Sequence, residues 1–182
     1  MAHIRLLLIW LLVRGPKMIL LRLVIQGFRL VTGRPVYRYS RVTPNLYLGG
    51  QPYKRGWHSI ESQGINAVVN LRRSDDLKRG LRPLHYLHLP TVDNCPPSLP
   101  DLQRGVAFIT EHIQAGDVVY VHCGVGVGRA PTLVAAYLVS TGMMPDAAWA
   151  RIRQIRPVIF PLSEQKRQVT AFYQQLLGDD SV

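Results

Sequence analysis

The chain has 182 residues, of which 22 are Lys or Arg and 11 are Asp or Glu, so its net charge is +11. This length suits one domain with a buried core and a short appendage. Its two cysteines are too few for a disulfide framework, which excludes the small secreted disulfide scaffolds and favours a reducing compartment.

The positive charge is concentrated in the first third of the chain. Residues 1–60 carry ten basic residues and no acidic one, and this part also holds two apolar runs, 6–13 and 18–25. Both runs are shorter than the roughly 20 residues that cross a bilayer, and Gly15-Pro16 between them breaks or kinks a helix. Arg22, Gln26 and Arg29 follow at helical spacing, so they share one face of an otherwise apolar helix.

We predict that residues 1–33 form an apolar, basic helical segment that lies on an anionic membrane surface. Three alternatives stay open. In the first, the segment packs on its own domain or in an oligomer. In the second, it is a secretory signal, although no small-residue cleavage site follows Val13. It is otherwise a tilted spanning helix, which Arg14, Lys17 and Arg22 make costly. The favoured location is cytoplasmic and peripheral to a membrane.

Residues 34–41 are polar and basic and are interpreted as a connector, and a folded domain is expected over 42–178. Strand-like and helix-like segments alternate in that domain, which is typical of an α/β fold. We expect strands at 45–48, 65–71, 84–89 and 117–122, and helices at 57–63, 99–114, 131–141, 145–155 and 163–177. The strand at 117–122 is apolar on both faces, which predicts a central position in a parallel sheet.

A glycine-rich loop directly after that central strand carries the main functional signal. Cys123 ends the strand and Arg129 opens the next helix. Backbone N–H groups of such a loop can cradle an anion, and an arginine fork can grip two phosphate oxygens. The same positive field favours the thiolate, which is the nucleophilic form of cysteine. The pattern predicts phosphoryl transfer through a phosphocysteine; the alternative is a core cysteine beside an ordinary turn. The expected phosphate-binding residues are Gly124, Val125, Gly126, Val127, Gly128 and Arg129.

The loop contains the signature His-Cys-x-x-Gly-x-x-Arg, formed by His122, Cys123, Gly126 and Arg129. By this signature, residues 41–177 resemble cysteine-dependent protein tyrosine and dual-specificity phosphatases. The resemblance implies a dual-specificity-phosphatase-like central sheet flanked by helices, with no metal and no cofactor in the mechanism. It also implies that His122 forms hydrogen bonds within the loop and tunes the thiolate.

The resemblance implies a general acid on a loop some thirty residues before the cysteine, where Asp93 stands. The alternative for Asp93 is a turn or helix-capping aspartate. Asp101 and Asp117 are weaker candidates, better interpreted as residues that start a helix and a strand. Gln165 stands where relatives often carry a glutamine that positions water; the alternative is a glutamine on a helix surface.

Ala130 departs from the pattern of many relatives, which have Ser or Thr directly after the arginine. The Gly-Arg-Ala-Pro sequence resembles the phosphatases of regenerating liver. A lost hydrogen bond to the departing thiolate costs about 1.5–3 kcal/mol, so we expect slow breakdown of the phosphocysteine. Cys95 is either a redox partner of Cys123 or a loop cysteine without a role.

The run from Leu89 to Val139 looks most like the mitochondrial tyrosine-phosphatase-like lipid phosphatases. The shared pieces are Thr-Val-Asp, Leu-x-x-Gly-Val-x-Phe, Val-Tyr-Val-His-Cys and Val-Ala-Ala-Tyr-Leu. Those relatives have basic residues inside the loop. Here Val125 and Val127 stand in it, which weakens the case for a polyphosphate or phosphoinositide substrate.

The function expected from the sequence is hydrolysis of phosphomonoesters by a dual-specificity phosphatase at a membrane surface. The substrate is either a protein phosphorylated on tyrosine, serine or threonine, or a simple phospholipid headgroup. The alternative is a slow phosphate-binding or trapping module at a membrane, which Ala130 would permit. Nucleic acid is not expected as a partner, because the basic residues are mixed with aliphatic ones and lack an aromatic stacking surface.

Overall fold

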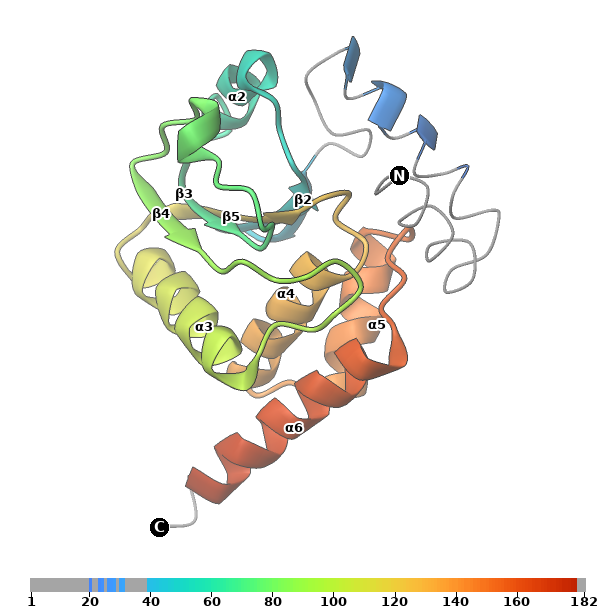
Figure 1. The fold of residues 1–182 in the computed structure, drawn as a ribbon. Helices are drawn as coiled ribbons and strands as arrows, with labels where there is room; N and C mark the ends of the chain where they lie inside the picture. Colours follow the sequence, from blue (N-terminus) through green and yellow to red (C-terminus); the bar gives the residue numbers. More distant parts are fainter. Residues whose placement is uncertain (1–19, 21–22, 25, 29, 32–38, 180–182) are drawn as a thin grey trace.

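The computed structural model describes residues 20, 23–24, 26–28, 30–31 and 39–179. A five-stranded sheet with the order β1-β2-β5-β3-β4 forms its centre (Figure 1). β1 runs antiparallel to β2, and the other neighbouring strands are parallel. The strands are β1 (Ser40–Thr43), β2 (Leu46–Gly50), β3 (Ile65–Asn70), β4 (His85–His88) and β5 (Val118–Cys123). The mixed sheet confirms the expected α/β class.

Helices cover both faces of this sheet (Figure 1). One face carries α2 (Lys54–Glu61), and the short 3-10 helix η1 (Leu77–Arg79) lies between β3 and β4 in the chain. The other face carries α3 (Leu99–Gln114), α4 (Arg129–Ser140), α5 (Pro145–Ile155) and α6 (Ser163–Asp179). α4 contacts α3, α5, α6 and the sheet, so it is the central helix of that layer.

An apolar cluster fills each side of the sheet. The larger one lies between the sheet and α3–α6. Every residue from Arg129 to Val139 of α4 is buried, and the alanine, leucine and valine residues among them belong to this cluster. The smaller one lies under α2 and includes Trp57, Ile60 and Tyr120. β5 thus has a covered face on each side, which explains its uninterrupted apolar sequence.

Most expected elements are present with shifted ends. α3 and α5 have the predicted bounds, and Ser98 begins α3 by accepting a hydrogen bond from the Asp101 amide at 3.2 Å. α4 begins two residues before Pro131, and α2 begins three residues before Trp57. The chain was not expected to form β1. Ser40 and Arg41, assigned to the connector, pair with β2, and Val42 is buried between the layers.

Only part of the N-terminal segment can be compared with its prediction. The described residues among 20–31 are helical, and their apolar side chains are exposed, including Leu23, Val24 and Phe28. The rest of 1–33, including Arg22 and Arg29, and connector residues 34–38 lie outside the described residues. Within the described part of the chain, no helix combines the length and the hydropathy needed to cross a bilayer.

Candidate active site

The glycine-rich loop joins the centre of the sheet to the central helix. Cys123 is the last residue of β5 and Arg129 the first of α4, and both side chains are buried, with 2% and 7% of their surface exposed. Gly124 and Val125 are half-buried, whereas the next three loop residues are buried. The thiol therefore lies at the base of a loop that faces the carboxyl ends of the parallel strands, where ligand sites of α/β sheets are found.

Arg156 holds this loop from behind. Its Nε donates to the Gly126 carbonyl at 2.8 Å and its Nη2 donates to the Val125 carbonyl at 3.0 Å, while Nη1 reaches Ser40 Oγ at 3.2 Å. Arg156 is 1% exposed and ends α5. Sequence reasoning missed this residue, because an arginine at a helix end usually lies in solvent.

The other three carbonyls of loop residues 124–128 also accept hydrogen bonds. Because the N–H and C=O groups of trans peptides point in opposite directions, bonding the carbonyls outward turns the amide N–H groups towards the thiol. This arrangement suits an anion cradle. The donors are the Gln51 amide to Gly124 at 3.1 Å, the Phe160 amide to Val127 at 2.7 Å, and Thr132 Oγ1 to Gly128 at 2.9 Å.

Only glycine fits at the middle of the loop. Gly126 has φ +73°, and a Cβ there would lie 2.4 Å from the Gly49 carbonyl oxygen. The glycine of the His-Cys-x-x-Gly-x-x-Arg signature is therefore required by backbone conformation and by its close approach to the end of β2.

The loop after β4 brings Asp93 to the arginine. Asp93 Oδ1 lies 2.9 Å from Arg129 Nη2, and Nη1 of the same guanidinium donates to the carbonyls of Thr91 at 2.9 Å and Leu71 at 3.3 Å. The Asp93 side chain is 28% exposed, so it stands at the open side of the site. The guanidinium is thus fixed by backbone contacts on one side and faces a carboxylate on the other.

His122 contacts a buried aspartate that sequence reasoning missed. Its Nε2 lies 2.7 Å from Asp76 Oδ2, and Gln51 Nε2 donates to Asp76 Oδ1 at 2.9 Å. The His122 Nδ1 lies 3.4 Å from the Cys123 carbonyl oxygen, and its ring stacks on Tyr120 with centroids 5.5 Å apart. Asp76 lies in a charged run, Arg-Arg-Ser-Asp-Asp, which is typical of a solvated surface, so no local signal pointed to it.

The pKa of Asp76 reflects competing effects. Burial raises it, but the hydrogen bond and charge of His122, the hydrogen bond of Gln51 and the charge of Arg79 lower it below the ordinary value of 3.8. The environment therefore holds this buried carboxylate in its ionised form.

Residues 46–175 match the catalytic domain of dual specificity phosphatases. The chain belongs to this family. It is a dual-specificity-phosphatase-type hydrolase, as the sequence predicted.

Several relatives of this phosphatase carry names that mention a lipid. It is 30% identical over 145 residues to the phosphatidylglycerophosphate phosphatase PTPMT1 of Arabidopsis thaliana, covering 74% of this chain and 42% of that protein. It is 30% identical over 151 residues to the human phosphatidylglycerophosphatase and protein-tyrosine phosphatase 1, covering 76% and 74% of the two chains. The crystal structure of PTPMT1 in complex with PI(5)P superposes with a TM-score of 0.71 at 27% identity, covering 78% of this chain and 98% of that one.

The phosphatase spans 42% of the length of the plant relative and 20% of the length of the mouse dual specificity protein phosphatase 8.

In this phosphatase Gln165 is buried, with none of its surface exposed, which excludes a glutamine on the helix surface. Its Oε1 accepts from the Leu162 amide at 3.0 Å, and its Nε2 donates to the Cys95 carbonyl at 3.2 Å. Gln165 therefore ties the start of α6 to the loop that carries Asp93. Cys95 itself is exposed, and both it and Cys123 are free thiols.

The two weaker acid candidates stand where a helix and a strand begin. Asp101 is in the first turn of α3, where its carboxylate accepts from Ser98 Oγ at 2.8 Å. Asp117 directly precedes β5, at the end of the strand opposite to Cys123. Ala130 is fully buried behind the arginine and offers no hydroxyl group.

Proposed function

We propose that this phosphatase hydrolyses phosphomonoesters through a phosphocysteine at Cys123, and that its substrate is a simple phospholipid headgroup. The main support for this reaction is the ion pair of 2.9 Å between Arg129 and Asp93, because it joins the loop that follows Cys123 to the loop that contains Asp93.

In the first step the Cys123 thiolate attacks phosphorus and forms an S–P bond while the P–O bond to the leaving group breaks. Arg129 and the loop amides hold the phosphoryl oxygens, and Asp93 gives its proton to the leaving oxygen. A substrate phosphate takes over the guanidinium edge that Asp93 now contacts. The carboxylate, no longer paired with this cation and now close to the negative phosphate, takes up from solvent the proton that it then gives to the leaving oxygen.

In the second step water attacks the phosphocysteine. Asp93 accepts a proton from this water, the S–P bond breaks, and inorganic phosphate leaves with the thiolate restored. The family resemblance suggests Gln165 as the residue that positions this water. Both ends of its side-chain amide now bond backbone groups of Leu162 and Cys95, so this role requires one of these bonds to be exchanged for the water.

Three observations support a simple phospholipid headgroup as the substrate. Relatives at 30% identity are named for phosphatidylglycerophosphate. In addition, apolar side chains are exposed on the described residues of 20–31, which suits contact with a membrane surface. Val125 and Val127 add no charge to the loop, which suits a phosphomonoester of low charge better than a polyphosphate.

The test compares the full chain with its Cys123→Ser variant on three substrates: p-nitrophenyl phosphate, a set of phosphopeptides, and phosphatidylglycerophosphate in vesicles. We expect the wild type to hydrolyse all soluble monoesters slowly and the lipid fastest, and the variant to be inactive. Activity that survives Cys123→Ser contradicts the mechanism. A higher kcat/KM on phosphopeptides than on the lipid contradicts the substrate and leaves the mechanism in place.

A second candidate function is a phosphate-binding or trapping module, which the buried Ala130 favours. In that case the full chain would bind the phosphorylated ligand tightly and turn over only once. Single-turnover and steady-state rates on the preferred substrate distinguish this module from an enzyme.

A further inference from the structure

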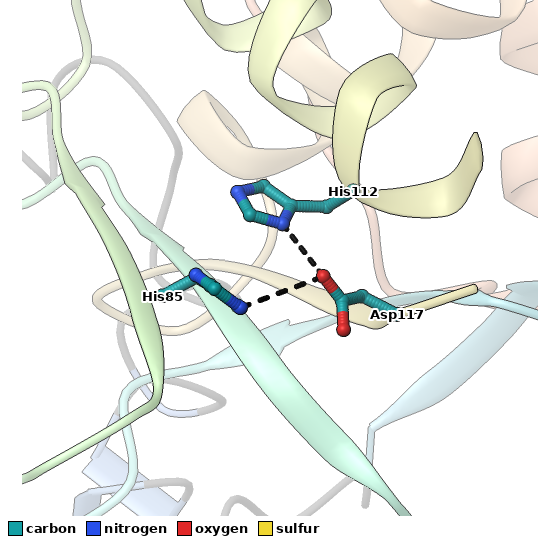
Figure 2. Close-up of side chains that lie close together, drawn as sticks. All are labelled: His85, His112 and Asp117. Atoms are coloured by element: carbon teal, nitrogen blue, oxygen red, sulfur yellow. Dashed lines mark hydrogen bonds and ion pairs between the residues drawn. The ribbon is translucent and has the colours of Figure 1, made fainter. Parts of the chain in front are cut away.

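We propose that His85, His112 and Asp117 form a binding site for a divalent transition metal of the zinc class, at the end of the sheet opposite to the active site. The proposal is independent of the phosphatase mechanism. Figure 2 shows the two imidazole rings converging on one carboxylate. The candidate ligand atoms of His85, His112 and Asp117 all lie within 4.8 Å of one another.

The topology brings the three residues together from separate elements. His112 lies in the last turn of α3 and Asp117 directly precedes β5, and the Asp117 amide donates to the His112 carbonyl at 2.8 Å across the tight connection. His85 begins β4, two strands away from β5. In the register of the sheet, Ala67 of β3 pairs with both His85 and Val119. This small residue lets the His85 ring reach across β3.

The separations suit a small metal ion. His85 Nε2 lies 3.6 Å and His112 Nδ1 lies 2.7 Å from the same oxygen, Asp117 Oδ2. A tetrahedral zinc ion with bonds of about 2.0–2.1 Å places neighbouring ligand atoms about 3.3 Å apart. Modest side-chain rotations therefore turn this cluster into three zinc ligands with a fourth position for water.

The chemistry of the side chains also favours a metal. The two rings are packed against each other, with centroids 4.3 Å apart, and both face one carboxylate. Two imidazole nitrogens and one carboxylate oxygen form a donor set that ions of the zinc class accept, and the carboxylate balances part of the charge of a divalent ion.

The surroundings hold the carboxylate in place. Asn66 Nδ2 donates to Asp117 Oδ1, and Asn66 Oδ1 accepts from the Val118 amide at 2.9 Å. The ring of Phe108 packs on His112, with centroids 4.2 Å apart. Such outer contacts orient metal ligands and increase affinity. The His85 side chain is 39% exposed, which leaves an entry path for the ion.

The site serves stability and not the phosphoryl transfer. Asp117 and Cys123 stand at opposite ends of β5, six residues apart, or about 20 Å at the rise of a strand. A bound ion would tie edge strand β4 and the end of α3 to β5.

The test titrates chelator-treated full chain with Zn²⁺ by calorimetry and with Co²⁺ by visible absorption. All proteins carry Cys95→Ser and Cys123→Ser, because thiolates are competing ligands. We compare the parent with His85→Gln, with His112→Gln and with the matched control His58→Gln, whose side chain is 93% exposed on α2.

We expect one equivalent of either ion to bind the parent and His58→Gln, and to raise their Tm. His85→Gln and His112→Gln should bind at least about a hundredfold more weakly, because loss of an outer contact alone costs about ten- to a hundredfold. The His85 side chain is partly exposed, so His85→Gln tests binding in a folded protein. Equal affinity in the parent and His85→Gln, or no binding at millimolar metal, overturns the proposal.

Discussion

At the scale of single residues, the active site depends on groups that contact the guanidinium of Arg129. Arg129 contacts Asp93 through one nitrogen and the carbonyls of Thr91 and Leu71 through the other. The guanidinium thus has one edge fixed by the backbone and one edge that a substrate can share. Substitutions around it should therefore separate binding from proton transfer.

Asp93→Asn should lower kcat/KM by about a hundred- to ten-thousandfold, because kcat/KM reports formation of the phosphocysteine and a general acid contributes this much to that step. The loss should be larger for alkyl phosphates than for p-nitrophenyl phosphate, whose leaving group needs less protonation. Steady-state kinetics on both substrates measure the difference. Asp101→Asn is the matched control, since the Asp101 carboxylate bonds Ser98 at the start of α3, whereas that of Asp93 faces Arg129; equal losses in the two variants would contradict the acid role of Asp93.

Ala130→Ser should speed breakdown of the phosphocysteine by about ten- to a hundredfold, if a hydroxyl supplies the hydrogen bond worth about 1.5–3 kcal/mol. The wild type should then show a burst of p-nitrophenol followed by a slow steady rate. Rapid-mixing kinetics measure both phases. A burst-free progress curve, with Ala130→Ser no faster than wild type, would show that another step limits turnover.

The buried carboxylate of Asp76, in contact with His122 and Gln51, should make stability depend on pH. The pKa of Asp76 is lowered in the folded state, so its stabilising effect is complete above the unfolded value of 3.8 and is lost as the pH falls through the lower folded value. Asp76→Asn should lower stability by about 1–3 kcal/mol near neutral pH, because it removes the carboxylate that contacts His122 and Gln51. The gap between wild type and variant should shrink below about pH 4, as measured by denaturant unfolding; a constant gap would exclude this linkage.

At the scale of elements, the loop is positioned by its neighbours on all sides. β2 approaches it at Gly49, and the amide of Gln51, directly after β2, donates to it. Arg156, directly after α5, holds it, and Phe160 donates to it from the segment before α6. The local sequence predicted the helices well, because α3 and α5 have strong periodicity and clear starts. It missed β1, since four residues carry little pattern and their pairing with β2 decides their conformation.

Arg156→Leu should distort the loop, because it leaves the Val125 and Gly126 carbonyls without their guanidinium donor. Each buried polar group left without a partner costs about 1–3 kcal/mol. We expect a lower Tm, a higher KM for p-nitrophenyl phosphate and a lower kcat. Arg153→Leu, an exposed position on the same helix, should change stability by less than about 0.5 kcal/mol. Similar kinetics in the two variants would contradict the role of Arg156 in positioning the loop.

At the scale of the whole molecule, the phosphatase has a folded catalytic domain and a basic, apolar N-terminal segment. The full chain should co-sediment with vesicles that contain anionic lipid, and a chain that begins at Val36 should not. The shorter chain keeps β1, which begins at Ser40. Neutral vesicles and high salt are the controls. Equal binding by both chains would contradict the membrane role, and a lower Tm of the shorter chain would favour packing of the segment on the domain.

The sequence by itself determined the α/β class, most helices and the order of thiol, glycine loop and arginine, because these follow from periodicity and close spacing along the chain. Only the tertiary structure decided that Asp76 contacts His122, that Arg156 holds the loop, and that Gln165 is buried against the acid loop. It also brought His85, His112 and Asp117 together. The physical reason is that these contacts arise from strand order and helix packing, which join residues that are far apart in the chain or on separate elements.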